Sequence, residues 1–261
     1  MKLTIYQVDA FAENVFQGNP AAVIPLENWI DNKLMQKIAM ENNLSETAFF
    51  VKTDDGFHLR WFTPQFEIDL CGHATLASAY IIKNFLEPHL ADISFTTPKA
   101  GLLKATAKDG MYTLDFPSRM PQLCEVPKQL FKSLNITTAV EVLKSRDYFV
   151  VLPNEEAVKN SEPDFTLMKE LDAIGVIVTA KGQSADVASR CFYPGAGIPE
   201  DPVTGSAHCN IVPYWSEKLN KTKLFCKQLS QRGGDLYCEL QGDRVLMTGK
   251  CVLYLEGEIE V

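Results

Sequence analysis

The sequence predicts an α+β fold made of two related halves, and three observations indicate it. Short runs rich in β-branched and aromatic residues alternate with a few helical segments along the 261 residues. A pattern of residues in the first half recurs in the second. Each copy of that pattern leads to a glycine directly before a helical segment, at Gly72 and at Gly205.

The first half opens with elements that local signals define. Alternating apolar residues predict the strands, Asp31 is a helix cap, and Asp54-Asp55-Gly56 is a turn. The predicted elements are a strand at 3–11, a strand at 21–26, a helix from Asp31 through Asn43, and a hairpin at 47–53 and 57–63.

The segment 74–86 is apolar on nearly every face until Lys83, which predicts a buried helix closed by Pro88. Three prolines in 115–127 then mark the best candidate for a boundary. We therefore expect an N-terminal lobe at 1–116 and a C-terminal lobe at 117–261, with the last strand able to return to the first lobe.

After the boundary a similar order of predicted elements recurs, with strands at 147–153 and 175–181 separated by a short helix. Four residues of the first half have an identical residue 130 positions later, and the strand at 48–51 matches 175–178. We interpret this recurrence as a duplication; two unrelated strand-turn-helix units are the alternative. The matched residues are Arg60, Phe62, Pro64 and Ile68 with Arg190, Phe192, Pro194 and Ile198.

Composition narrows the class of function. The net charge is -8 and no basic run is interleaved with aromatic residues, so no nucleic-acid partner is expected. No stretch has the roughly 20 apolar residues that span a bilayer, and no export signal is recognised at the N-terminus, so no membrane partner is expected. Seven scattered cysteines then favour free thiols and a cytoplasmic protein.

The two glycine-led helix starts predict an anion site. A helix start presents unpaired backbone N–H groups and the positive end of the helix dipole, and glycine lets an anion approach closely. We expect Gly72, Thr204, Gly205 and Ser206 to bind a small carboxylate in one shared cleft. Many helix starts bind only water, so the signal is of moderate specificity.

Three titratable side chains are candidate catalytic residues. Glu46 follows a helix and precedes an apolar strand, where a buried carboxylate could give and take a proton; a solvated loop glutamate is the alternative. His73 is a proton relay or a donor to an oxyanion, or it only caps the helix. Asp201 orients the substrate or His73, or it only forms the turn before Pro202.

Cys71 also stands at a helix start, which could stabilise its thiolate. A two-base racemase needs an opposing thiol in the second half, where the segment 201–204 contains no cysteine and Pro202 takes the partner's place. We therefore expect Cys71 to be a buried core residue.

No metal or nucleotide cofactor is expected. Cys71 with His73, and His208 with Cys209, lack zinc-site spacing. Neither a phosphate-binding loop nor a dinucleotide-binding glycine motif is present.

Four segments together resemble the PhzF-like family of phenazine-biosynthesis proteins. They occur in the family's order over nearly the whole length, up to a turn at residues 231–234. The segments are Gly18-Asn19-Pro20-Ala21-Ala22-Val23, Leu44-Ser45-Glu46-Thr47-Ala48-Phe49, Cys71-Gly72-His73-Ala74-Thr75 and Asp201-Pro202-Val203-Thr204-Gly205-Ser206-Ala207.

The resemblance implies the diaminopimelate-epimerase fold, in which two pseudosymmetric lobes each wrap a mixed sheet or barrel around a central helix. It also implies a cofactor-independent isomerase in which Glu46 moves a proton on a dihydro-hydroxyanthranilate-like ring, and in which His73, Asp201 and Ser206 contact the substrate. Family habit further suggests a homodimer.

The working hypothesis is thus a cofactor-independent isomerase of a small cyclic or amino-acid-like carboxylate, with Glu46 as general acid/base. Two alternatives stay open. One is a non-catalytic protein that binds a small carboxylate, and the other is an epimerase or racemase that depends on Cys71.

Overall fold

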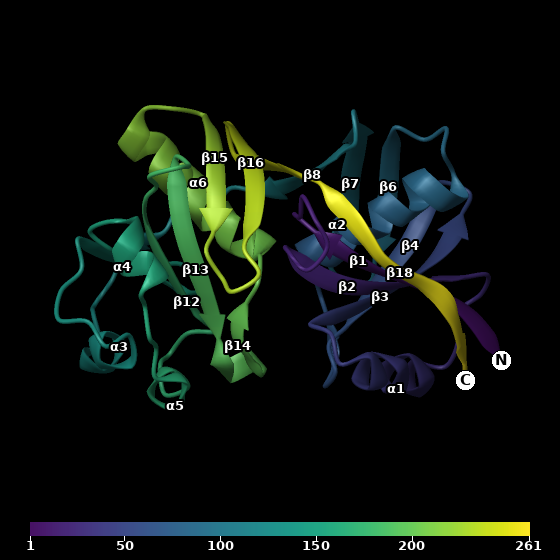
Figure 1. The fold of residues 1–261 in the computed structure, drawn as a ribbon, viewed down its shortest axis with the longest axis horizontal. Helices are drawn as coiled ribbons and strands as arrows, with labels where there is room; N and C mark the ends of the chain where they lie inside the picture. The colour runs from purple at the N-terminus through teal and green to yellow at the C-terminus, as the bar shows by residue number, and fades with distance from the viewer. The chain divides into compact units, whose positions relative to one another are not determined.

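The computed structural model describes all 261 residues, and the chain forms two compact units. Unit 1 contains Met1–Asp115 and Thr248–Val261, and unit 2 contains Phe116–Met247. The chain passes from one unit to the other within β8 and again within β17 (Figure 1). Strands predominate and helices are few, so the predicted α+β class is confirmed.

Unit 1 holds nine strands, two α-helices and one π-helical turn. Its elements are β1 (Lys2–Ala10), β2 (Asn19–Leu26), α1 (Asn32–Asn42), β3 (Glu46–Thr53), β4 (Gly56–Phe62), β5 (Glu67–Ile68), α2 (Gly72–Ile81), η1 (Ile82–Leu86), β6 (Asp92–Thr97), β7 (Gly101–Lys108), β8 (Met111–Pro117) and β18 (Cys251–Glu260).

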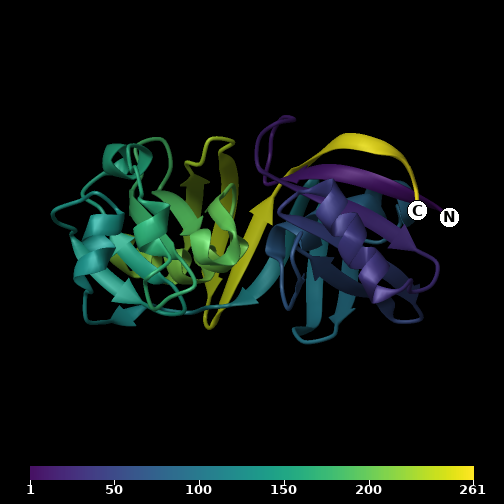
Figure 2. The same cartoon turned by 90° about the horizontal axis from the view of Figure 1, so that it is seen from below.

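The ladder of unit 1 runs β18-β1-β2-β3-β4-β6-β7-β8. The β2–β3 and β4–β6 pairs are parallel and the other pairs are antiparallel. The first and last strands lie side by side, with Lys2 opposite Glu260, so the two termini meet at one end of the unit (Figure 2).

Unit 2 holds most of the remaining strands and the short helices. Its elements are β9 (Gln122–Leu123), α3 (Lys128–Ser133), β10 (Glu141–Lys144), β11 (Tyr148–Val151), α4 (Glu155–Lys159), α5 (Phe165–Met168), β12 (Val176–Lys181), β13 (Val187–Tyr193), η2 (Pro194–Ala196), β14 (Ile198–Asp201), α6 (Gly205–Leu219), β15 (Lys223–Gln228), β16 (Gly234–Gln241) and β17 (Arg244–Gly249).

The strand pairing of unit 2 repeats that of unit 1. Its ladder β10-β11-β12-β13-β15-β16 has the same alternation of parallel and antiparallel pairs as β1-β2-β3-β4-β6-β7. In each unit a short strand and then a long helix follow the fourth strand of this series. The repetition predicted from sequence is therefore present in the topology.

The repeat also corrects one detail of the sequence alignment. Arg60 lies opposite Phe49, and its counterpart Arg190 lies opposite Val178. Residues 175–178 thus correspond to 46–49, two positions earlier than the predicted match with 48–51. A two-residue slip leaves every side chain on the same face of the sheet, so the apolar pattern alone could not exclude it.

An equivalent arginine–glutamate ion pair, which we call an arginine lock, joins the two strands of a β-hairpin in each unit. Arg60 makes a two-point ion pair with Glu67, at 2.7 Å from both Nε and Nη2, and Arg190 makes one with Glu200 at 2.7 and 2.9 Å. Each guanidinium also lies over a phenylalanine two residues on, at 5.2 Å in unit 1 and 5.1 Å in unit 2. These locks hold the strand that leads into each glycine-led helix.

Helix α2 has the burial that its sequence predicts. Eight of its ten residues are buried, and it packs against β1, β2, β3 and β7. The helical course continues through the π-helical turn to Leu86, as predicted. None of the helices combines the length and the apolar character required to span a bilayer.

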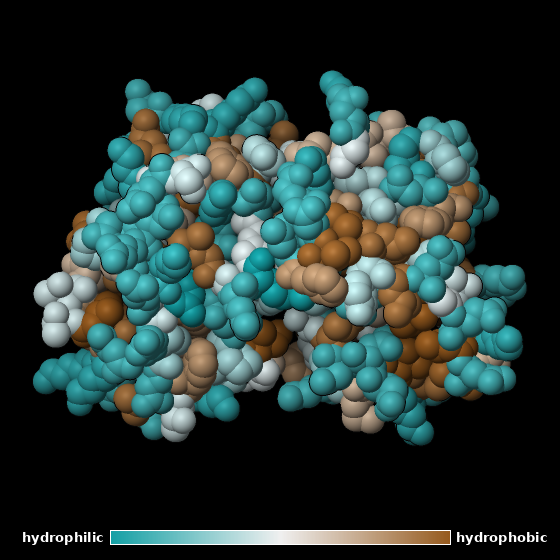
Figure 3. All heavy atoms as spheres, viewed as in Figure 1, coloured by the Kyte–Doolittle hydropathy of each residue, from teal (hydrophilic) through white to brown (hydrophobic).

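The face drawn in Figure 3 is mostly hydrophilic, and its hydrophobic side chains lie in separate patches. Two exposed aromatic side chains of unit 1, Phe16 and Tyr254, contact each other edge to face with ring centroids 5.7 Å apart. The polar surface agrees with the net charge of -8.

Candidate active site

Unit 1 brings two of the predicted catalytic residues into contact. Oε2 of Glu46, the first residue of β3, lies 3.0 Å from Nε2 of His73 in the first turn of α2. Glu46 is 6% exposed and His73 is 4% exposed. The oxygen lies off the direction of a well-aligned hydrogen bond, so this buried carboxylate atom keeps an unused acceptor position.

Two further side chains surround His73. Nδ2 of Asn19, at the start of β2, lies 3.1 Å from Nδ1 of His73, and the Sγ atom of Cys71 lies 3.5 Å from the same nitrogen. Asn19 is fully buried and Cys71 is 6% exposed. The imidazole therefore has a protein group at each ring nitrogen.

The charges of this cluster act on one another. Burial and, to a lesser extent, the charge of Glu46 raise the pKa of the Cys71 thiol to about 11, although His73 opposes this rise. Burial lowers the pKa of His73, whereas a Cys71 thiolate and Glu46 raise it, with a net rise well above the usual value. At neutral pH Cys71 is an uncharged thiol, so only Glu46 then acts on His73 by its charge.

Glu46, Cys71 and His73 also have the composition of a three-ligand metal site. One ligand atom of each lies within 4.8 Å of the others. Carboxylate, thiolate and imidazole are all zinc ligands. Spacing in the sequence does not reveal this cluster, because Glu46 is distant from Cys71 and His73 in the chain.

Both predicted helix starts are free of side-chain caps. Cys71 stands at the N-cap of α2 and Thr204 at the N-cap of α6, and neither side chain makes a capping hydrogen bond to its helix. Neither first turn contains an acidic residue. Each start therefore presents backbone donors and a positive dipole end to an anion.

In unit 2 a hydrogen-bonded cluster surrounds Asp201. Its Oδ2 accepts from the Thr204 hydroxyl at 2.5 Å. The fully buried Gln228 donates to the backbone oxygen of Asp201 at 2.7 Å and accepts from the backbone N–H of Thr204 at 2.9 Å. Gln228 thus fixes the segment between β14 and α6.

A second polar group approaches the start of α6. Nη2 of Arg146 donates to Oγ of Ser206 at 3.3 Å and to Oδ2 of Asp147 at 2.8 Å. Tyr193 donates to Asp147 at 3.2 Å, and burial raises the pKa of this phenol well above its usual value, so it stays protonated. The helix start at Ser206 therefore has a guanidinium beside it.

The two helix starts differ in that only the first has a carboxylate counterpart on the neighbouring strand. Gly175 is the counterpart of Glu46 by strand register, and a Cβ at this position would lie 2.2 Å from the ring of Tyr193. The ring of Tyr193 thus takes up the space that a side chain at this position would need. Unit 2 accordingly has no carboxylate at the place where unit 1 carries Glu46.

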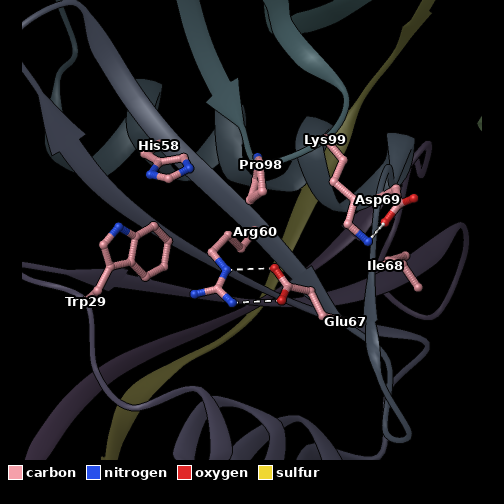
Figure 4. A pocket seen from close by; sticks show the side chains of 8 residues that line it. All are labelled: Trp29, His58, Arg60, Glu67, Ile68, Asp69, Pro98 and Lys99. Atoms are coloured by element: carbon pink, nitrogen blue, oxygen red, sulfur yellow. Dashed lines mark hydrogen bonds and ion pairs between the residues drawn. The ribbon is translucent and has the colours of Figure 1, made fainter.

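A cavity of about 260 Å³ in unit 1 is lined by none of the predicted site residues (Figure 4). Its cations are already paired: Arg60 with Glu67, and Lys99 with Asp69 at 2.7 Å. Trp29 lies 5.2 Å from the Arg60 guanidinium and completes one wall. The residues that line this cavity include the Arg60–Glu67 ion pair that holds the hairpin, so the cavity is not the proposed site of the reaction.

Comparison with known proteins decides the family. The family model described as "Phenazine biosynthesis-like protein" matches residues 8–257. The chain belongs to this PhzC-PhzF family. A protein of Pseudomonas aeruginosa named as an uncharacterized isomerase is 48% identical over 261 residues, covering all of both chains. A crystal structure of a PhzF-family protein from Enterococcus faecalis has a TM-score of 0.97 at 48% identity, again over the full length of both.

The fold extends beyond the family. A predicted epimerase from Pseudomonas aeruginosa has a TM-score of 0.76 at 19% identity and covers 99% of each chain. This likeness shows the fold alone. Together the comparisons confirm the resemblance that the four sequence segments indicate, and the chain is a PhzF-like isomerase.

The structure of this PhzF-like protein bears on each predicted site residue. Glu46 is buried, not a solvated loop residue, and contacts His73. Asp201 is the last residue of β14 and accepts a hydrogen bond from the Thr204 hydroxyl. Cys71 is buried as expected, but its counterpart at the second helix start is Thr204, not Pro202, because both residues are N-caps.

Sequence reasoning missed three polar residues of these clusters. Asn19 lies in a family segment, so its place could have been suspected, although nothing local indicates that it meets His73. Arg146 and Gln228 carry no sequence signal, because their contacts join residues 60 and 24 positions apart.

Proposed function

We propose that this PhzF-like isomerase works without a cofactor and moves a proton on a small cyclic or amino-acid-like carboxylate, such as a dihydro-hydroxyanthranilate-like ring. Glu46 is the general acid/base. The observation that carries the proposal is the buried Glu46 carboxylate, which touches His73 and has an unused acceptor position.

The reaction needs no net change in charge or oxidation state. Glu46 takes a proton from one carbon of the substrate as that C–H bond breaks, and the resulting carboxylic acid returns the proton to another carbon. Nε2 of His73 lies 3.0 Å from Oε2 of Glu46, so the imidazole stabilises the carboxylate by electrostatic attraction while it is charged. A low-dielectric site strengthens this interaction, because few waters compete for it.

In this proposal the substrate carboxylate binds at uncapped helix starts. Gly72 supplies one start, and Gly205 with Ser206 supplies the other. Asp201 orients the substrate. The Thr204 hydroxyl donates to Oδ2 of Asp201 at 2.5 Å and so holds the Asp201 carboxylate in place. The homodimer that the resemblance suggests and the cytoplasmic location that the cysteines favour are part of the same proposal, and light scattering and cell fractionation test them.

A screen in D₂O tests the proposal and separates it from the binding-protein alternative. The protein is incubated with small cyclic and amino-acid-like carboxylates, and NMR follows loss of carbon-bound ¹H. Deuterium entry together with an isomerised product supports the proposal. Ligands that raise the melting temperature without any exchange would instead establish a non-catalytic carboxylate-binding protein.

A further inference from the structure

We propose that unit 2 carries a second binding site, at the C-terminal end of α6, for a small primary ammonium ion with an apolar body. The site is a cavity of about 510 Å³ whose lining residues all lie within 118–242. This volume is in the range of small-molecule sites. The 15 residues of α6 place its last turn about 20 Å from Gly205, so the cavity is separate from the proposed carboxylate site.

The cavity has one uncompensated charge, and it is negative. Glu217 and Lys221 are the charged side chains that line it. The Lys221 ammonium lies 2.6 and 2.7 Å from the two carboxylate oxygens of Asp186, and the nearby Lys218 pairs with Glu141 at 3.2 Å. Glu217 is exposed, and its carboxylate forms no ion pair and no hydrogen bond. A cation therefore complements the charge of this cavity.

The end of α6 adds partial negative charge to the same place. The last carbonyl groups of a helix lack intrahelical partners and carry the negative end of the helix dipole, which favours cations. The helix ends at Leu219, and Asn220 follows in the left-handed conformation, with its N–H directed to the backbone oxygens of Ser216 and Glu217. The C-terminal end of α6 thus attracts a cation, whereas its N-terminal end attracts an anion.

Ser216 provides an independent observation that points to a ligand. Its side chain lines the cavity and is 5% exposed, and its Oγ has no hydrogen-bond partner. A buried hydroxyl without a partner costs free energy, and such groups are uncommon in native proteins. The hydroxyl can turn among three staggered positions about the Cα–Cβ bond. A ligand N–H at this wall supplies the missing partner.

The apolar part of the wall is formed before any ligand binds. Pro213, Met120 and Leu240 supply its apolar surface. Because proline has no N–H, the carbonyl of Cys209 has no partner within α6, and it accepts from the backbone N–H of Arg119 at 2.8 Å. This bond fixes the segment that carries Met120 against the helix. A ligand therefore loses little affinity to ordering of the site.

These features together specify the class of ligand. A primary ammonium group has three N–H donors for the Ser216 hydroxyl and the Glu217 carboxylate. A short hydrocarbon chain on that group covers the apolar surface of Met120 and Leu240. A ligand that carries a carboxylate would be repelled by Glu217, so the substrate class proposed for the helix starts does not fit this cavity.

The test uses 3-methylbutylamine, which is charged at pH 7, and 3-methylbutan-1-ol as a neutral molecule of nearly the same shape. Backbone ¹H–¹⁵N NMR of the full chain follows each titration. For the amine we expect saturable shifts at residues 216–222 and 240–242, with a Kd on the order of 1 mM. We expect the alcohol to bind at least about 5-fold more weakly, because it lacks the charge.

Three variants locate the binding. We expect Glu217→Gln to weaken amine binding on the order of 10-fold and Ser216→Ala about 3-fold. Glu170→Gln alters another exposed glutamate of unit 2 and should bind as the wild type does. Since Glu217 is exposed, its variant should fold, and it decides the matter if Ser216→Ala does not.

The proposal is overturned if the amine causes no saturable shift at these residues up to about 20 mM. Equal binding of the alcohol, or unchanged binding by Glu217→Gln, would also overturn it. Shifts spread over the acidic surface without saturation would show non-specific attraction only, and so would refute the site. None of these results bears on the proposed isomerase reaction, which the deuterium screen tests separately.

Discussion

Oε2 of Glu46 lies 3.0 Å from Nε2 of His73, and both side chains are more than nine-tenths buried. These residues come from a strand and a helix that are 27 positions apart in sequence. A buried carboxylate is costly unless a partner stabilises its charge, and here the partner is the imidazole of His73. The pair is the basis of the proposed proton transfer.

The protonation state of Cys71 predicts that its thiol is not required for catalysis. Its pKa of about 11 leaves about one thiol in 10⁴ ionised at pH 7. We expect Cys71→Ser to lose less than about 10-fold in turnover, well below the loss from removing a proton carrier. A loss as large as that of Glu46→Gln, or rapid inactivation by iodoacetamide at pH 7, would favour the Cys71-dependent epimerase.

The cluster of Glu46, Cys71 and His73 makes metal dependence directly testable. Under the proposed function a chelator leaves turnover unchanged, whereas added Zn²⁺ inhibits, because the ion engages the Glu46 carboxylate and the imidazole. Chelator should reverse that inhibition. Activity that disappears on dialysis against chelator and returns with Zn²⁺ would establish a metal enzyme instead.

The two arginine locks should differ in their effect on stability. Arg190 also donates to the backbone oxygens of Lys159 and Ser161, at 3.0 and 2.7 Å, which lose their partner if the side chain is removed. We expect Arg190→Leu to lower the free energy of unfolding by about 3 kcal/mol. For Arg60→Leu we expect about 1–2 kcal/mol, since its partner Glu67 is one-third exposed and can be rehydrated. Urea unfolding measures both, and equal losses would contradict this account.

His208 should make the fold sensitive to acid. Its pKa in the folded protein is about 4, below the 6.5 of an unfolded chain, so the unfolded state binds more protons between these values. Stability is then complete above pH 6.5 and falls by about 3 kcal/mol as the pH drops to 4. His208→Asn can keep a donor toward Thr204 but does not titrate, so its unfolding free energy should lose this slope. A variant with the same slope would assign the acid sensitivity to other groups.

Local signals in the sequence predicted local structure well. Asp31 caps α1 by accepting from Lys33 and Leu34, and the apolar segment after Gly72 is a buried helix. The repeat could also be recognised, because Arg60 and Arg190 occupy equivalent places in equivalent hairpins. These features depend on residues close in sequence or on a pattern that recurs.

Contacts between distant segments could not be predicted from one sequence. The two-residue slip in the repeat keeps the apolar alternation intact, so only the ladder reveals that Glu46 corresponds to Gly175. Likewise, Asn19 reaches His73 across 54 positions. Glu46 and His73 were predicted as site residues, but their contact and the contact of Asn19 with His73 are visible only in the folded chain.

The most direct test of the proposed chemistry is deuterium exchange by Glu46→Gln, compared with Glu41→Gln, which alters an exposed glutamate five residues earlier. On any substrate found in the D₂O screen, we predict that Glu46→Gln still binds and that its exchange falls on the order of 10²–10⁴-fold, while Glu41→Gln exchanges at the wild-type rate. Full exchange and turnover by Glu46→Gln would contradict the assignment of Glu46 as the proton carrier.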